Sequence, residues 1–244
     1  MTKLSDLTPK APKILLYSPA GKGKTALALT CGESCQIMDL DDGTVTGVSL
    51  KDSFLDSRKS VDVVQFLETD ALKATAYKGA LEYVKTVAKQ CREGTYKYKV
   101  LVIDSLTALD SYCMRYVMQN SGGILKKIEL QHWGVAFQEL KQFLLTVRSL
   151  PIAVILLAHE QPKGASETEV TIAISGRKMP AEVLRFFDEV WYLKARPAAG
   201  GKVQRVLQTV SDARIECRSR FCIADGTDVN VGMPKLLEQM GYKL

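Results

Sequence analysis

The sequence lacks the patterns that mark membrane-inserted, secreted and zinc-binding proteins. Its longest uninterrupted apolar run, Ile152 to Ala158, is far too short to cross a bilayer. The first residues, Met1 to Asp6, contain no apolar core of a signal peptide. The six cysteines form no C-x-x-C pair, and His132 and His159 do not follow them at the spacing of a zinc site. We therefore expect reduced thiols and a cytoplasmic location.

The chain also lacks a strong charge imbalance. Its formal net charge is +6, a value that permits nucleic-acid binding but does not indicate it. With 244 residues, of which 46% are hydrophobic, the chain can bury one substantial core. We expect an N-terminal tail over residues 1–12 and a single domain over residues 13–244.

Apolar runs alternate with helix-spaced apolar positions along most of the chain. Strands are expected at residues 14–17, 36–40, 61–66, 100–103 and 152–157, and helices from residue 26, over 70–90 and over 133–150. This alternation predicts an α/β fold with a doubly wound, mostly parallel sheet. Beyond residue 190 the pattern changes. Residues 190–193 and 203–210 predict an antiparallel hairpin that extends the sheet, and residues 234–240 a short closing helix.

One short segment carries the sharpest chemical signal. It reads Ser18-Pro19-Ala20-Gly21-Lys22-Gly23-Lys24-Thr25, and it lies between an apolar run and the helix that continues through Ala26. A Gly-rich loop between strand and helix, ending in Lys-Thr, predicts a P-loop, whose backbone N–H groups and helix dipole bind phosphate. Lys24 is expected at the β- and γ-phosphates and Thr25 on Mg²⁺, so ATP and Mg²⁺ are the predicted cofactors. Ser18 replaces the usual Gly, which costs stability if that position needs a positive φ.

Acidic residues follow two of the expected strands. Asp104 ends the run 100–103 and is expected to hold Mg²⁺ through water, although it could instead cap the next helix. Ser105 rather than an acid follows it, so a water-activating base must lie elsewhere or be lacking. The carboxyl ends of parallel strands converge on the ligand crevice, and Asp39, Asp41 and Asp42 follow the second strand. We favour Asp41 as the base and Asp42 as the second choice. The alternative is a solvated acidic turn.

His159 follows the last central strand, where a polar side chain can contact a γ-phosphate. A histidine with a purely structural hydrogen bond is an equally good interpretation of this position.

The order of these motifs resembles the ATPase core of RecA-type recombinases. With Asp39-Leu40-Asp41, Ala158-His159 and the stretch 177–193, the sequence is most similar to the short phage-encoded RecA-like ATPases of single-strand annealing, over about residues 12–225. The resemblance implies one RecA-like ATPase core domain, located in the host cytoplasm if the chain is phage-encoded. It places Asp41 where the recombinases have a catalytic Glu, and the shorter acid implies slow hydrolysis. It places His159 at their γ-phosphate-sensing Gln.

The resemblance also implies two DNA-facing loops and a shared catalytic centre. The loops match residues 120–127 and 160–176, both rich in Gly and polar residues and therefore expected to be mobile. Their basic candidates for phosphate contacts are Lys126, Lys127, Lys163, Arg177 and Lys178. For any one of them alone, an ordinary solvated side chain is the better interpretation. Arg218 and Arg220 match basic residues supplied to a neighbour's ATP, although a generic basic surface is equally possible. Single-stranded DNA, further copies of the chain and a single-strand-binding protein are the implied partners.

Three functions remain open at this point. The leading one is a slow, DNA-stimulated ATPase that acts on single-stranded DNA in recombination, annealing or repair. The second is a small-molecule P-loop kinase, for which no Arg-bearing lid is evident in the sequence. The third is a nucleotide-binding interaction module with little or no hydrolysis.

Overall fold

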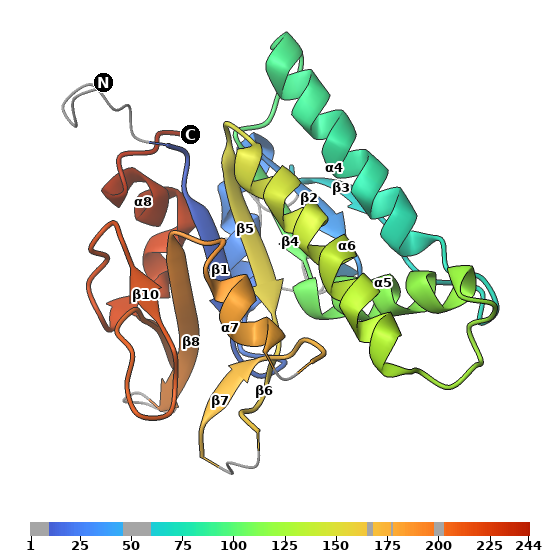
Figure 1. Ribbon diagram of the computed structural model, residues 1–244. Helices are drawn as coiled ribbons and strands as arrows, with labels where there is room; N and C mark the ends of the chain where they lie inside the picture. Colours follow the sequence, from blue (N-terminus) through green and yellow to red (C-terminus); the bar gives the residue numbers. More distant parts are fainter. Residues whose placement is uncertain (1–9, 46–59, 165–167, 177, 198–202) are drawn as a thin grey trace, which may run out of the picture.

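A nine-stranded sheet forms the centre of the computed structural model (Figure 1). The structure describes residues 10–45, 60–164, 168–176, 178–197 and 203–244. The main path of the sheet is ordered β11-β9-β8-β1-β5-β4-β2-β3, and β10 pairs with β8. The strands are β1 Lys13–Tyr17, β2 Cys35–Asp39, β3 Asp62–Gln65, β4 Val100–Asp104, β5 Ala153–Ala158, β8 Glu189–Pro197, β9 Val203–Gln208, β10 Arg218–Ser219 and β11 Thr227–Asp228.

The strand directions confirm the predicted fold class. From β3 to β8 every neighbouring pair along the path is parallel. The last strands are antiparallel, and β8 and β9 form the hairpin expected near the C-terminus. Every residue of β1, β2, β4 and β5 is buried, as continuous apolar runs covered on both faces require. The edge strand β3 is largely exposed.

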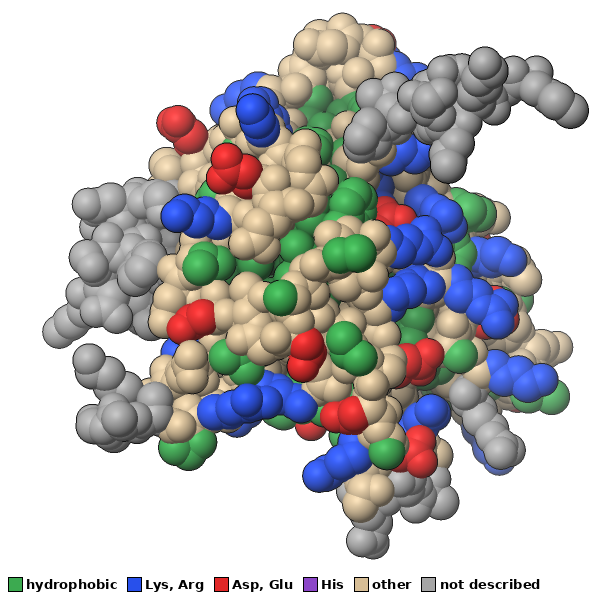
Figure 2. Space-filling view, turned by 90° about the vertical axis from the view of Figure 1, so that its left-hand side faces the viewer, with side chains coloured by type: hydrophobic (Ala, Val, Ile, Leu, Met, Phe, Trp, Pro, Cys, Tyr) green, Lys and Arg blue, Asp and Glu red, His purple; other side chains and the backbone are tan. Residues whose placement is uncertain are grey.

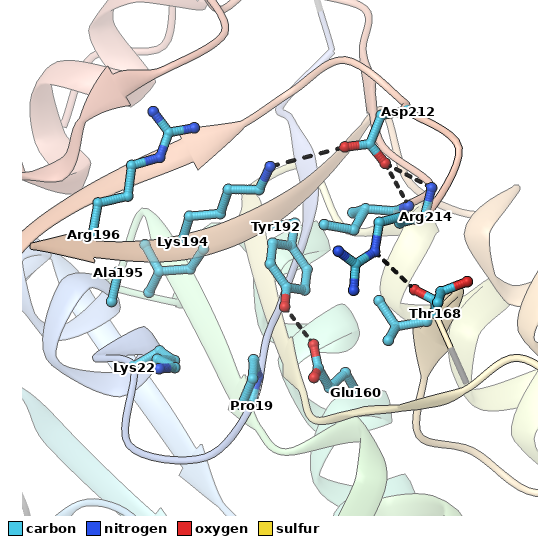
Figure 3. A pocket seen from close by; sticks show the side chains of 13 residues that line it. Pro19, Lys22, Glu160, Thr168, Tyr192, Lys194, Ala195, Arg196, Asp212 and Arg214 are labelled. Carbon is cyan, nitrogen blue, oxygen red and sulfur yellow. Dashed lines mark hydrogen bonds and ion pairs between the residues drawn. The ribbon is translucent and has the colours of Figure 1, made fainter. Parts of the chain in front are cut away.

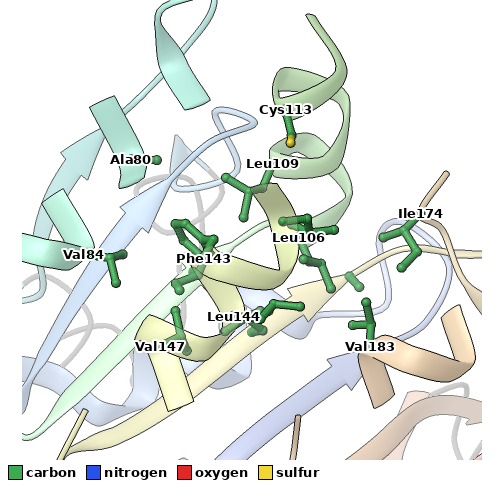
Figure 4. Packing of buried hydrophobic residues seen from close by; sticks show 14 of the residues in the cluster. Ala80, Val84, Leu106, Leu109, Cys113, Phe143, Leu144, Val147, Ile174 and Val183 are labelled. Carbon is green, nitrogen blue, oxygen red and sulfur yellow. The ribbon is translucent and has the colours of Figure 1, made fainter. Parts of the chain in front are cut away.

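Helices cover both faces of the sheet. One face carries α4 Ala76–Glu93, α5 Leu106–Asn120, α6 Leu130–Ser149 and α7 Met179–Leu184, and the other carries α1 Lys24–Ala28, the 3-10 helix η2 Leu29–Ser34 and α8 Gly232–Gln239. Successive residues of β1 alternate between the two cores, since Leu15 packs under α4–α7 while Ile14 and Leu16 pack under α1 and α8. In the larger core, Phe143 of α6 lies among side chains of α4 and α5 (Figure 4). None of the helices in the described ranges is both long and apolar enough to cross a membrane.

Several boundaries differ from the sequence-based expectation. The helix expected from residue 70 begins at Ala76, whose N–H is capped by Glu68 Oε1 at 2.7 Å. The helix expected from residue 133 begins three residues earlier, at Leu130. The expectation that residues 160–176 form only a loop is wrong, because β6 Glu160–Pro162 and β7 Val170–Ile172 pair as a separate antiparallel ribbon. The N-terminal tail over residues 1–12 stays a prediction, since residues 1–9 lie outside the described part of the chain.

Two neighbouring leucines of α6 provide a matched test of this packing. Leu144 is 1% exposed and Leu145 is 51% exposed. Leu144→Ala should lower the free energy of unfolding by about 2–5 kcal/mol, because it leaves a cavity in the core. Leu145→Ala should change it by less than about 0.5 kcal/mol. Urea denaturation followed by circular dichroism measures both, and equal losses in the two variants would contradict the assigned faces of α6.

Candidate nucleotide site

The loop between β1 and α1 has the backbone of a phosphate-binding loop. Gly21 and Gly23 adopt φ values of 73° and 99°, in the left-handed region where a side chain is strained. Gly23 directly precedes α1, so the N–H groups of the first helical turn open toward the loop. Ser18 is not among the non-glycine residues with a positive φ, so Ser in place of the usual Gly causes no backbone strain there.

Lys24 is a buried cation held by the loop itself. Its side chain is 6% exposed, and Nζ donates to the carbonyl oxygens of Ser18 and Pro19, both at 3.0 Å. Burial lowers the pKa of Lys24, and the carboxylates of Asp104 and Asp41 oppose that shift. A cation that is paired mainly with carbonyl oxygens, beside a loop of N–H groups, is suited to an incoming anion. The residues of this loop therefore fit a nucleotide phosphate.

Asp104 joins the loop to the end of β4. Thr25 Oγ1 donates to Asp104 Oδ2 at 2.6 Å. Burial and the nearby Asp41 carboxylate raise the pKa of Asp104 to about 6, against the hydrogen bond from Thr25. The alternative interpretation of Asp104 as a helix cap is wrong, because Ser105 is the N-cap of α5 and its side chain accepts from the N–H of Ala108. Oxygen ligands of this kind are the ones that Mg²⁺ prefers.

The acidic cluster after β2 divides into three different environments. Asp39 is fully buried and accepts hydrogen bonds from the N–H groups of Asp41, Gly43 and Thr44 at 3.1–3.4 Å, so it organises the loop. Asp42 has a positive φ of 60°, and its Oδ1 accepts from Gln65 on the exposed side. Asp41 and Asp104 approach each other around Gly43, where an added Cβ would lie 3.0 Å from Asp41 Oδ1 and 3.1 Å from Asp104 Oδ2.

Asp41 also faces His159. Nε2 of His159 lies 3.8 Å from Oδ2 of Asp41, and the side chains are 37% and 28% exposed. Burial raises the pKa of Asp41, but the neighbouring His159 and Ser105 side chains outweigh this effect, and the net pKa lies below the ordinary value. The backbone of His159 is fixed by Thr107 Oγ1, which accepts from its N–H at 3.0 Å. Lys24, Thr25, Asp104, Asp41 and His159 thus meet at the carboxyl ends of β1, β4, β2 and β5.

The predicted DNA-contacting residues are dispersed. Lys126 and Lys127 lie in the connection between α5 and α6, and Lys178 directly precedes α7. Lys163 forms an ion pair with Glu169 at 3.4 Å across the end of the β6–β7 ribbon. Arg177 lies outside the described residues. Figure 2 shows that Lys and Arg side chains gather along one side of the face that lies to the left in Figure 1.

Arg218 and Arg220 do not approach the P-loop of their own chain. Arg218 is the first residue of β10 and Arg220 follows that strand, which pairs with the beginning of β8, whereas the P-loop follows the end of β1. The guanidinium of Arg218 donates to the carbonyl oxygens of Leu184 and Phe187, and that of Arg220 to Asp188 at 3.0 Å. Their predicted contribution to a neighbouring copy stays a prediction, but in this chain both groups have partners.

Two residues at the site were missed by sequence reasoning. Arg205 of β9 donates from Nε to the carbonyl oxygen of Lys22 at 2.9 Å, and its side chain packs against Gly23. Tyr192 of β8 donates to Glu160, the neighbour of His159, at 2.5 Å. Neither residue carries a local signal, because each reaches the site from a strand that is distant in the sequence.

Comparison with known proteins gives one family match. The AAA domain family matches residues 10–221 of the chain. No curated protein matches the chain. Among solved structures, the crystal structure of the RadB recombinase is similar with a TM-score of 0.46 and 18% sequence identity, over 92% of this chain and 88% of that chain.

The raised pKa of Asp104 predicts a pH dependence of stability in the ligand-free chain. A carboxyl whose pKa rises from 3.8 to about 6 on folding binds its proton more tightly in the folded state. Its ionisation therefore destabilises the fold progressively as the pH rises from about 4 through 6. Asp104→Asn should gain stability relative to the parent over this window and keep a constant advantage above it. Urea denaturation at pH 4, 5, 6 and 7 measures the difference, with exposed Glu82→Gln as the control. A difference that does not change with pH would contradict the assignment.

Proposed function

Because this chain belongs to the AAA domain family, we propose that it is a slow ATPase that acts on single-stranded DNA in recombination, annealing or repair. One observation carries the proposal. The P-loop cation Lys24 and the Thr25–Asp104 pair lie at the same sheet edge as the Asp41–His159 pair. The first group suits a nucleotide phosphate with its metal, and the second suits a water molecule that attacks the phosphate.

Each residue of the site has a distinct role in this proposal. Lys24 would neutralise the β- and γ-phosphates of ATP, and Thr25 and Asp104 would hold Mg²⁺. Bound Mg²⁺ would neutralise the negative charge that develops on the phosphate oxygens. Asp41 would orient and deprotonate the attacking water, while His159 holds the Asp41 carboxylate and contacts the γ-phosphate.

The electrostatics of Asp41 support slow turnover. A general base works best when its pKa lies near the operating pH. The neighbouring His159 and Ser105 side chains keep the pKa of Asp41 below its ordinary value, so Asp41 is a weak proton acceptor at neutral pH. The same observation favours a nucleotide-binding module with little turnover as the second candidate function.

The proposed DNA contacts rest on exposed basic side chains outside the nucleotide site. Lys126 and Lys127 are exposed in the connection before α6, Lys163 is exposed directly after β6, and Lys178 is exposed directly before α7. Arg177, which lies outside the described residues, is a further proposed DNA contact. Such cations would neutralise DNA phosphates in a salt-dependent, weakly sequence-selective manner. Self-association in the cytoplasm, with Arg218 and Arg220 directed to a neighbour, and contact with a single-strand-binding protein belong to the same proposal.

The experiment that tests the function is phosphate release from ATP with and without single-stranded DNA. Single-stranded DNA should increase the rate for the parent chain. Lys24→Ala should abolish turnover, because it removes the buried cation from the phosphates. The surface variant Lys85→Ala, in an exposed ion pair on α4, should behave as the parent. Turnover near the parental rate in a folded Lys24→Ala chain would refute the phosphate-binding role of the loop.

Substitutions of the adjacent residues Asp41 and Asp42 test which of the two is the general base. Asp41→Asn should keep ATP binding and lose turnover by about a hundredfold or more, because a general base acts mainly in the transition state. Asp42→Asn should keep both, since Asp42 turns toward Gln65. Nucleotide affinity by calorimetry and phosphate release give the two readouts. The opposite result, with only Asp42→Asn inactive, would move the base to Asp42.

A further inference from the structure

We propose that a cavity beside the outer wall of the P-loop is a second anion site, which binds the phosphate and the attached nucleoside of a single nucleotide. The cavity measures about 440 Å³ and lies between the P-loop, the β6–β7 ribbon, β8 and the segment 212–215 (Figure 3). Its basic lining residues are Lys22, Lys194, Arg196 and Arg214, and its acidic ones are Glu160 and Asp212.

The cavity is separate from the nucleotide site already described. Lys24, Thr25 and Asp104 do not line it, and the P-loop contributes only Pro19 and Lys22. The alternation of β8 explains the separation. Trp191 and Leu193 pack under α1 and α8, so the side chains of Tyr192 and Lys194 point to the opposite face of the sheet.

Both acids of the cavity have hydrogen-bond partners within the chain. Glu160 accepts from the Tyr192 hydroxyl at 2.5 Å. Asp212 accepts from the N–H groups of Arg214 and Ile215, both at 2.8 Å, and these bonds lower its pKa. Its other oxygen accepts from Gln208 at 3.0 Å and lies 3.9 Å from Lys194 Nζ. The carboxylates therefore hold the cavity in shape, while the excess of two positive charges is left for a ligand.

The guanidinium of Arg214 is positioned for such a ligand. Its Nε donates to the carbonyl oxygen of Thr168 at 3.1 Å, which fixes the plane of the group. Figure 3 shows the rest of the guanidinium pointing into the cavity, above Glu160 and beside Tyr192. A fixed guanidinium with further N–H donors binds phosphate in a bidentate manner.

The remaining walls define the rest of the ligand. Pro19, Val170, Tyr192 and Ile215 supply apolar surface next to the cations. A phosphate monoester carries nearly two negative charges at neutral pH, which matches the excess positive charge of the lining. A volume of about 440 Å³ is within the range of small-ligand pockets and suits one nucleotide rather than a length of strand. The nucleotide could be free in solution or the phosphorylated end of a DNA strand.

The test is calorimetric titration with deoxyadenosine monophosphate after the P-loop has been saturated with Mg²⁺ and a non-hydrolysable ATP analogue. The parent should bind about one further nucleotide per chain. Arg214→Gln combined with Lys194→Gln should weaken that binding by about 10- to 100-fold, because charged hydrogen bonds are lost. Arg185→Gln, which removes an exposed cation paired with Glu182 outside the cavity, is the matched control and should bind as the parent. Arg196→Gln alone should weaken binding to a smaller extent.

Affinity for the ATP analogue is measured in the same samples and should be equal in all variants, so failure of this site is distinguished from failure of the P-loop. A 5′-phosphorylated and an unphosphorylated oligodeoxynucleotide separate the two sources. Tighter binding of the phosphorylated than of the unphosphorylated strand, lost in the double variant, assigns the site to strand ends. Tighter binding of the mononucleotide than of the phosphorylated strand assigns it to free nucleotide. The proposal is overturned if neither phosphorylated ligand binds, if the double variant binds as the parent, or if inorganic phosphate binds as tightly as the mononucleotide.

Discussion

The parallel pairing of four fully buried strands is the constraint on which the site depends. Tyr17 at the end of β1 is in register with Ala158 at the end of β5, and Asp39 at the end of β2 is in register with Asp104 at the end of β4. The polar residues at and after the ends of these strands must therefore lie side by side at the carboxyl edge of the sheet. A shift of one residue would move every side chain of a strand to the opposite face, and both faces are committed to packed cores.

Carboxylates buried at this edge destabilise one another, and hydrogen bonds within the fold offset part of this effect. Asp39 and Asp104 are buried, and the partly exposed Asp41 lies beside them. Asp39 is compensated by backbone N–H groups and Asp41 by His159 and Ser105, while the pKa of Asp104 rises because burial and Asp41 disfavour its charge. A divalent cation between Thr25 and Asp104 would relieve this repulsion, since a bound metal is the largest local charge in such a site.

The C-terminal hairpin has a second role beyond extending the sheet. Its strand β9 brings Arg205 onto the P-loop, and its strand β8 brings Tyr192 onto Glu160. The same hairpin supplies Lys194 to the cavity on the outer side of the loop. The candidate nucleotide site and the cavity therefore share the P-loop as a common wall, and Tyr192 and Lys194 reach the cavity from one face of β8.

The sequence by itself determined the fold class, the P-loop, the acid at the end of β4 and the antiparallel hairpin. Each of these depends on a local pattern: continuous apolar runs, a Gly-rich turn before Lys24-Thr25, an acid after a buried strand, and β-rich runs joined by a Gly-rich turn. Only the tertiary structure decided which acid faces His159, because the positive φ of Asp42 and its contact with Gln65 turn it away. It also decided that Arg218 bonds to carbonyl oxygens near α7 and that Arg205 reaches Lys22 across 183 positions of sequence. Contacts of that separation depend on strand order and side-chain direction in the folded sheet, which no local pattern encodes.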